Sequence, residues 1–213
     1  MSTKRIYLYP KWLRLWHIIN ALLCLTLIFT GLSMQFSSKE TILLNFFTSV
    51  RIHDITGISL AVNYLLFFIG NLATANKRHY RIPAKGFTGN IIKQLKYYLS
   101  GMFKGKKAPF PTTEEQKFNP VQQITYKTVM YFMVPVMVIT GGLMFFHSVI
   151  PYRIYNINGP LFVDVVHLCG AFIITLFLLI HLYFATIGHT PTAHFKSIIN
   201  GYHELDEEEK EEK

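Results

Sequence analysis

The chain has 213 residues, of which 51% are hydrophobic and 15% are charged, and its formal net charge is +9. Its long apolar runs, separated by short polar segments, exclude the mixed pattern of a soluble domain. Ten of the 21 Lys and Arg residues fall within residues 75–120. A membrane topology accounts for this clustering, so the charge does not require a nucleic-acid partner.

Four stretches are long enough to cross a bilayer, because a spanning helix needs about 20 mostly apolar residues. They cover about residues 13–34, 52–74, 122–147 and 161–187. We therefore predict an all-α integral membrane four-helix bundle over residues 1–203, followed by an acidic disordered tail at 204–213. The first stretch has no A-x-A-like cleavage site after it, so we expect it to be retained.

The basic residues predict the orientation of the four spans. Four lie before or at the very start of the first span (Lys4, Arg5, Lys11 and Arg14), whereas the segments 35–51 and 148–160 hold only Lys39, Arg51 and Arg153. By the positive-inside rule, both termini and the long middle loop are cytoplasmic. Within that loop, "NIIKQLKYYLSGMFKG" (90–105) places apolar residues at helical spacing opposite lysines. This pattern predicts a short helix lying in the inner membrane interface.

Histidines within the spans point to a metal cofactor. With the N-terminus inside, His17 and His181 lie near the inner surface, and His53 and His167 lie near the outer surface. His167 and His181 are fourteen residues apart, which is roughly 21 Å of helix and within about 40° of four full turns, so they share a face. An unpaired imidazole is costly to bury in hydrocarbon, and two neutral imidazoles at one depth suit a haem iron.

Small residues and the other histidines are assigned by the same depth argument. Gly31 stands fourteen residues after His17 and would leave room for a flat macrocycle, as would Gly57 and Gly170. Small residues also occur wherever membrane helices pack closely, so both interpretations stay open. The remaining histidines are expected at the interface, on the surface or in loops: His79, His147, His189, His194 and His203.

Several segments together resemble the di-haem cytochrome b subunits of bacterial membrane-bound oxidoreductases. They are "RLWHIIN", "RIHDITG", "KFNPVQQ", the fourth span with its two histidines, and "HFKSIINGYHE". Over residues 10–203 the chain is similar to the gamma subunit of respiratory formate dehydrogenase and to the cytochrome b subunit of thiosulfate reductase-type complexes. It is more distantly similar to the cytochrome b of nickel-iron hydrogenases. The resemblance implies an outer haem b on His53 and His167, an inner haem b on His17 and His181, and the bacterial cytoplasmic membrane.

The resemblance also implies a menaquinone or ubiquinone site beside the inner haem. It is formed in part by Lys117, Phe118, Asn119, Val121 and Gln122. From their chemistry alone, the amides of Asn119 and Gln122 could donate hydrogen bonds to a quinone carbonyl. The alternative is that Asn119 caps the first turn of the third span.

Arginines near the two layers are candidates for pairing haem propionates, because a guanidinium matches the geometry of a carboxylate. Arg14 lies in the inner layer, and Arg51 or Arg153 could serve in the outer layer. For Arg14, the positive-inside rule explains the position equally well.

The expected function is electron transfer between an outer-face redox partner and the membrane quinone pool through two haems. No catalytic residue is assigned, because the chain lacks a soluble domain and the cysteine clusters that metal-cluster chemistry requires; Cys24 and Cys169 lie in different spans. We therefore expect a subunit whose outer partner is an iron-sulfur or multihaem protein. Two alternatives are a haem-free membrane anchor subunit and a small transporter whose histidines bind metal or other ions.

Overall fold

Helices dominate the computed structural model, which describes residues 5–37, 43–83, 86–154, 156–187 and 190–204. Four helical stretches are long and apolar enough to cross a membrane by length and composition: Lys11–Phe36 (α1), Phe46–Ala73 (α2), Pro120–Phe145 and Gly159–Ala185 (α6). The predicted all-α membrane fold is confirmed. Each helix begins two to six residues before its predicted start.

Side-chain caps explain two of these early starts. The Oδ1 atom of Asn45 accepts a hydrogen bond from the backbone N–H of Phe47 at 3.0 Å, at the start of α2. Asn119 Oδ1 accepts from the Gln122 N–H at 3.0 Å, and Gln122 Oε1 accepts from the Asn119 N–H at 3.2 Å. This capping box starts the third span, with Pro120 at its first helical position. The hydropathy-based prediction began both helices after their capped first residues.

The third span changes helix type along its length. It comprises α4 (Pro120–Thr128), a π-helical turn (Val129–Met133) and α5 (Val134–Phe145). Pro135 lies in the first turn of α5. Proline has no N–H to donate to the preceding helical turn, and the hydrogen-bonding register changes immediately before it.

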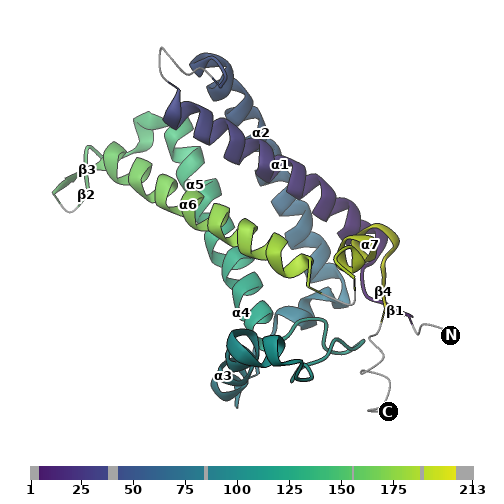
Figure 1. Ribbon diagram of the computed structural model, residues 1–213. Coiled ribbons are helices and arrows are strands. Elements are labelled where there is room, and N and C mark those ends of the chain that lie inside the picture. The colour runs from purple at the N-terminus through teal and green to yellow at the C-terminus, as the bar shows by residue number, and fades with distance from the viewer. Residues whose placement is uncertain (1–4, 38–42, 84–85, 155, 188–189, 205–213) are drawn as a thin grey trace. The chain divides into compact units, whose positions relative to one another are not determined.

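The chain forms two compact units. Unit 2 comprises Leu15–Ile69 and Tyr131–Ile180, and thus most of α1, α2, α5 and α6. Within it, Figure 1 shows α1 alongside α2 and α5 alongside α6. A two-stranded hairpin of Arg153–Ile154 (β2) and Ile157–Asn158 (β3) precedes α6.

Polar contacts join α1 to α2 within unit 2. The Ser49 hydroxyl donates to the Ser33 hydroxyl at 3.1 Å, and both side chains are fully buried. The indole of Trp16 donates to the backbone carbonyl of Asn63 at 3.0 Å. Such contacts hold helices together in a bilayer, where the hydrophobic effect between helices is weak.

Unit 1 comprises Met1–Arg14, Gly70–Met130 and His181–Lys213. Its helix α3 (Phe87–Lys96) continues through a π-helical turn and a 3-10 turn to Lys104, which confirms a helix near residues 90–105. A second helix, α7 (Ala193–Asn200), precedes the strand Tyr202–Glu204 (β4).

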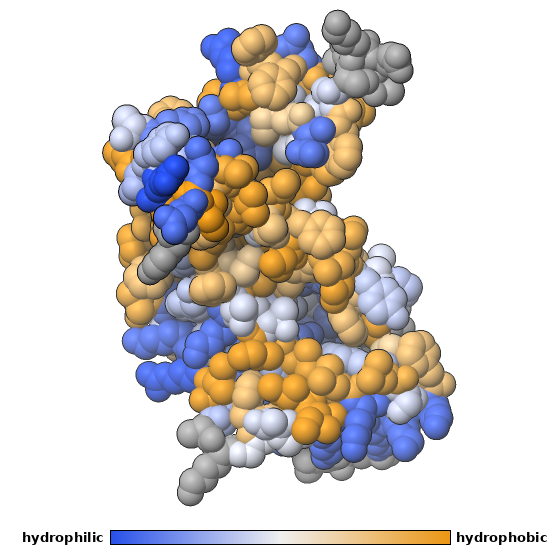
Figure 2. Space-filling view, turned by 90° about the vertical axis from the view of Figure 1, so that its left-hand side faces the viewer, coloured by the Kyte–Doolittle hydropathy of each residue, from blue (hydrophilic) through white to orange (hydrophobic). Residues whose placement is uncertain are grey.

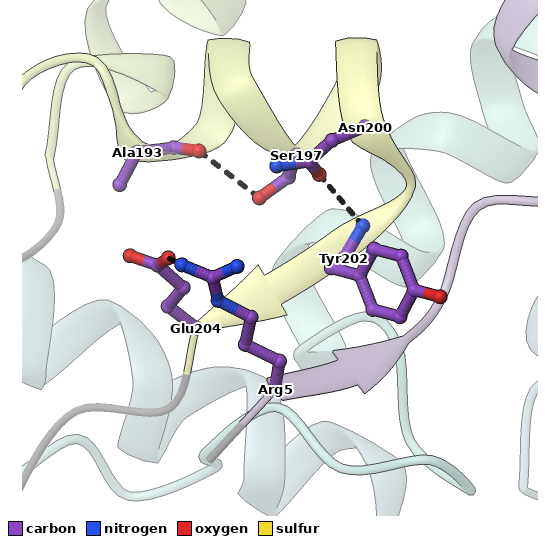
Figure 3. Close-up of polar contacts among 6 residues, drawn as sticks. All are labelled: Arg5, Ala193, Ser197, Asn200, Tyr202 and Glu204. Atoms are coloured by element: carbon purple, nitrogen blue, oxygen red, sulfur yellow. Dashed lines mark hydrogen bonds and ion pairs between the residues drawn. The ribbon is translucent and has the colours of Figure 1, made fainter. Parts of the chain in front are cut away.

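The two described ends of the chain pair with each other in unit 1. The strand Arg5–Tyr7 (β1) is antiparallel to β4, with Arg5 opposite Glu204 and Tyr7 opposite Tyr202. Figure 3 shows the ion pair between Arg5 and Glu204, at 2.8 Å, and the Tyr202 N–H donating to Asn200 Oδ1, also at 2.8 Å. This short sheet was not predicted, because it joins segments almost 200 residues apart.

Apolar side chains cover much of the exposed surface, as Figure 2 shows for the face in view. On α6, for example, Phe172 is 70% exposed and Leu179 is 60% exposed. Lipid would cover such residues in a membrane. Most of the predicted acidic tail, residues 205–213, and His189 lie outside the described residues.

Candidate functional site

The structure brings together His53 of α2 and His167 of α6, both in unit 2. Their ring centres are 6.4 Å apart and their planes are inclined by 70°. Two imidazoles on opposite sides of one metal ion, each with a nitrogen about 2 Å from it, have centres roughly 6 Å apart. The separation therefore fits a shared haem iron.

Glycines lie against both rings of this outer pair. A Cβ atom on Gly31 would be 3.7 Å from His53 Cε1, and a Cβ atom on Gly141 would be 3.3 Å from His167 Cε1. Gly31 was expected to leave room in the outer layer, and the residue beside it is His53. A Cβ on Gly57 would meet no atom within 4 Å, so there is room beside that residue as well.

Gly170, in contrast, serves close helix packing. A Cβ atom there would lie 2.5 Å from Met137 Sδ of α5. Of the two interpretations offered for the small residues, packing is therefore the one that the contacts favour at this position.

Two threonines that the sequence analysis did not select contact the outer pair. Thr30 Oγ1 of α1 lies 2.9 Å from His53 Nδ1, and Thr140 Oγ1 of α5 lies 2.8 Å from His167 Nδ1. Each threonine precedes one of the glycines, in the similar segments "IFTGLSM" (28–34) and "VITGGLM" (138–144). That repeated pattern is a signal by which these residues could have been found.

The inner pair is divided between the two units. His17 lies in unit 2, where its ring centre is 6.4 Å from that of Trp16. His181 lies in unit 1, with its Nδ1 3.4 Å from the hydroxyl of Tyr126. The pairing of His17 with His181 stays a prediction.

The predicted quinone segment connects to His181 through aromatic contacts within unit 1. The ring centres of Phe118 and Tyr126 are 5.0 Å apart, and those of Tyr126 and His181 are 5.9 Å apart. Val121 lies in the first turn of α4. The segment thus begins a continuous aromatic contact chain that ends at a predicted haem ligand.

Asn119 and Gln122 form the capping box of α4. Asn119 therefore caps the first turn of the third span, the alternative given for it above. Their side-chain oxygens are engaged with backbone N–H groups. The Asn119 amide also donates to the hydroxyl of Tyr98 at 2.7 Å. Each of these side-chain amides also has an N–H group that can donate to a ligand.

Buried ionisable groups surround this segment. Lys117 is 5% exposed, and its ammonium lies 4.2 Å from the ring centre of Tyr9. Burial lowers the pKa of Lys117 to about 7. Burial, together with the positive charges of Lys117 and Arg78, lowers the pKa of His79 to about 4. Burial raises the pKa of Tyr9 to about 12 and also raises that of Tyr98.

A pocket of about 210 Å³ lies in unit 1 beside this cluster. Its walls are partly apolar and partly polar, and are formed by Leu8, Pro10, Trp12, Thr74, Ala75, Asn76, Arg78 and His79. His79 lies between the second and third spans, and in addition it lines this pocket. His194 and His203 are half-buried and stack with their ring centres 5.7 Å apart, whereas His147 is exposed.

Arg14 donates a hydrogen bond to the backbone carbonyl of Ile199, in the last turn of α7. Its Nε is buried and has no hydrogen-bond partner among the described residues. Arg51 of α2 and Arg153 of β2 are exposed. The part of the chain that the structure describes contains no group of three or more His, Cys, Asp or Glu side chains that could hold a metal ion.

Comparison with known proteins gives a consistent identification. Residues 8–201, which include all four membrane histidines, match the family described as prokaryotic cytochrome b561. The chain is 36% identical over 206 residues to an Escherichia coli (strain K12) protein named "Putative cytochrome YdhU", an alignment that covers 94% of this chain and 75% of that protein. The chain belongs to the prokaryotic cytochrome b561 family, and is a membrane cytochrome b of electron transfer.

Proposed function

We propose that this cytochrome carries electrons between a redox partner at the outer membrane face and the quinone pool, through two haems b. The observation that carries the proposal is the pair His53 and His167, with ring centres 6.4 Å apart. Bound haem supplies reversible one-electron chemistry, and the protein supplies ligands, position and electrostatic environment.

The inner haem is assigned to His17 and His181. Their predicted common depth and the fourteen-residue spacing from His167 to His181 support this assignment. Arg14 adds support, since its Nε is a buried donor without a described partner. A haem propionate is a suitable acceptor for it.

The quinone is assigned to the cluster around Lys117 and the adjacent pocket in unit 1. A site with apolar walls and a few polar groups suits a ligand that has an apolar body and polar oxygens. Lys117, with its pKa lowered to about 7, can both give and accept a proton at physiological pH. The aromatic contacts from Phe118 through Tyr126 to His181 support a quinone site near a predicted inner haem ligand. Menaquinone and ubiquinone both fit this description.

The layout would make turnover electrogenic in a bacterial cytoplasmic membrane. Electrons cross most of the bilayer between the two layers of histidines, while the quinone exchanges protons at the cytoplasmic side. Each charge that moves across 100 mV corresponds to about 2.3 kcal/mol. The outer partner would be an iron-sulfur or multihaem subunit, because the chain itself carries no cysteine cluster for such centres.

The test is a reduced-minus-oxidised spectrum of the purified protein, with haem measured per polypeptide. We expect b-type bands and about two haems. His53→Ala and His167→Ala should each lose one haem and keep the other, since each removes a ligand of the outer haem only. The exposed His147 offers a matched control: His147→Ala should keep both haems.

Two outcomes would overturn the proposal. A folded, membrane-inserted wild-type protein without haem would favour the anchor alternative. A protein that binds divalent metal ions through the same histidines, and not haem, would favour the transporter.

A further inference from the structure

The outer histidines are held in the same way by two different helices. Thr30 contacts His53 Nδ1 at 2.9 Å, and Thr140 contacts His167 Nδ1 at 2.8 Å. Thr30 is 1% exposed and Thr140 is 7% exposed. The threonine side of each hydrogen bond is thus buried, and a buried polar atom without such a partner would be destabilising.

The hydroxyl protons determine the direction of both hydrogen bonds. Thr30 Oγ1 is also 2.8 Å from the carbonyl oxygen of Thr26, and Thr140 Oγ1 is 2.7 Å from that of Val136. A carbonyl has no proton, so the hydroxyl must donate in each of these contacts. A hydroxyl has one proton only. It must therefore accept from the imidazole, and the ring proton is on Nδ1.

This tautomer has a direct consequence for metal binding. With the proton on Nδ1, the lone pair of each ring is on Nε2, the nitrogen that remains available as a ligand. The threonines thus prepare both rings for coordination through the same atom. They also restrict rotation of each ring, because a rotated ring would break the hydrogen bond.

The neighbouring glycines complete the arrangement. Gly31 and Gly141 lie against the Cε1 atoms of the two rings, where a Cβ would be 3.7 Å and 3.3 Å away. In each case the first helix of a pair, α1 or α5, supplies a Thr-Gly dipeptide, and the next long helix, α2 or α6, supplies the histidine. The outer site therefore contains the same local arrangement twice, a Thr-Gly dipeptide on one helix in contact with a histidine on the next long helix.

We propose that Thr30 and Thr140 are positioning residues that set the tautomer and ring orientation of the outer haem ligands and, through them, the reduction potential of the outer haem. The inference rests on the proposed function, because it concerns the same haem. An Nδ1–H that donates a hydrogen bond makes Nε2 a more basic ligand. A more basic ligand favours ferric iron, so both threonines lower the potential of the outer haem.

The test uses Thr30→Val and Thr140→Val, which keep the shape of the side chain but remove the acceptor. We expect each variant to raise the potential of the outer haem in an optical redox titration. At a fixed ambient potential, the ratio of reduced to oxidised outer haem should rise up to about tenfold, which for one electron is 59 mV. The inner haem should titrate as in the wild type.

Two further variants separate positioning from simple structural support. Thr175 of α6 also donates to a helix carbonyl, that of Ala171 at 2.8 Å, so Thr175→Val tests the loss of that bond alone and should leave both potentials unchanged. Thr30→Ser and Thr140→Ser retain the hydroxyl and should restore the wild-type titration. Loss of only the outer haem in a valine variant, with recovery in the serine variant, also supports the inference.

Valine variants that keep both haems at wild-type potentials would overturn this inference while leaving the proposed function intact. Serine variants that fail to restore an altered potential would overturn it as well, because the effect would then arise from packing. Absence of haem from the wild-type protein would instead overturn the proposed function. The low-spin ferric resonance of the outer haem gives a second readout that is independent of activity.

Discussion

The outer histidine pair of unit 2 and the buried cluster around Lys117 in unit 1 differ in how firmly they hold their protons. In the outer pair, the hydroxyls of Thr30 and Thr140 donate to helix carbonyls, so each imidazole carries its proton on Nδ1. In the cluster, burial lowers the pKa of Lys117 to about 7. A site for electrons alone works best with fixed protons, whereas quinone chemistry needs a group that exchanges them near neutral pH. Under the proposed function, burial thus fixes the ring protons of the outer pair and makes the proton of Lys117 exchangeable near neutral pH.

The largest effect is expected from filling the space beside His167. Gly141→Val should remove the outer haem, because a Cβ at this position is already 3.3 Å from the ring and valine adds two methyl groups. Haem per polypeptide should fall from about two to about one. Gly142→Val is the matched control, since a Cβ on Gly142 would meet no atom within 4 Å. Equal haem loss in both variants would show that α5 tolerates no bulk, and that Gly141 has no special role.

The next effect tests the proton-exchanging region. Lys117 is protonated below pH 7 and loses its proton as the pH rises through its pKa of about 7. Quinone reduction by the wild type should therefore slow as the pH rises through about 7. Lys117→Met should turn over at least tenfold more slowly at pH 6, since general acid catalysis contributes about 10²–10⁴-fold, and should lose this pH step.

The exposed Lys104 provides the control for that experiment. Lys104→Met should keep both the rate and the pH step of the wild type. If Lys117→Met retained the step, another group would be the proton donor, and the contrast between the two regions would lose its main support.

A smaller effect is expected at Asn119, where two roles overlap. Asn119→Ala removes an N-cap, which costs about 1 kcal/mol, so the thermal midpoint should fall. Asn119→Asp keeps the capping oxygen and should hold the midpoint near that of the wild type. Because the aspartate cannot donate a hydrogen bond, the KM for quinone should still rise several-fold. An unchanged KM would leave Asn119 with the capping role alone.

The spans were predictable because hydropathy over some twenty residues dominates all other signals in a membrane protein. Their exact starts were not, because Asn45 and Asn119 begin α2 and α4 through side-chain caps that hydropathy treats as loop. The β1–β4 pairing was also out of reach. It depends on where two distant segments meet, and each strand has only three residues.

Within the candidate site, the sequence predicted the histidines but not what holds them. A fourteen-residue spacing reports which residues share a face of one helix, so it found His167 with His181. The contact of Thr30 with His53 depends on the register between α1 and α2, which no single-helix spacing contains. A threonine in a membrane helix commonly bonds its own backbone, as Thr26 and Thr175 do, so the residue type alone gave no indication.

The smallest effect is expected at the ends of the chain in unit 1, far from either kind of chemistry. The side chains of Arg5 and Glu204 are 56% and 30% exposed, and exposed ion pairs contribute about 0–1 kcal/mol. Arg5→Gln should therefore leave the thermal midpoint nearly unchanged at physiological salt. Gly201→Ala should lower it clearly, because Gly201 has φ +89° and a Cβ there would lie 2.8 Å from the ring of Tyr7. A larger loss from Arg5→Gln than from Gly201→Ala would mean that charge, and not backbone geometry, joins β1 to β4.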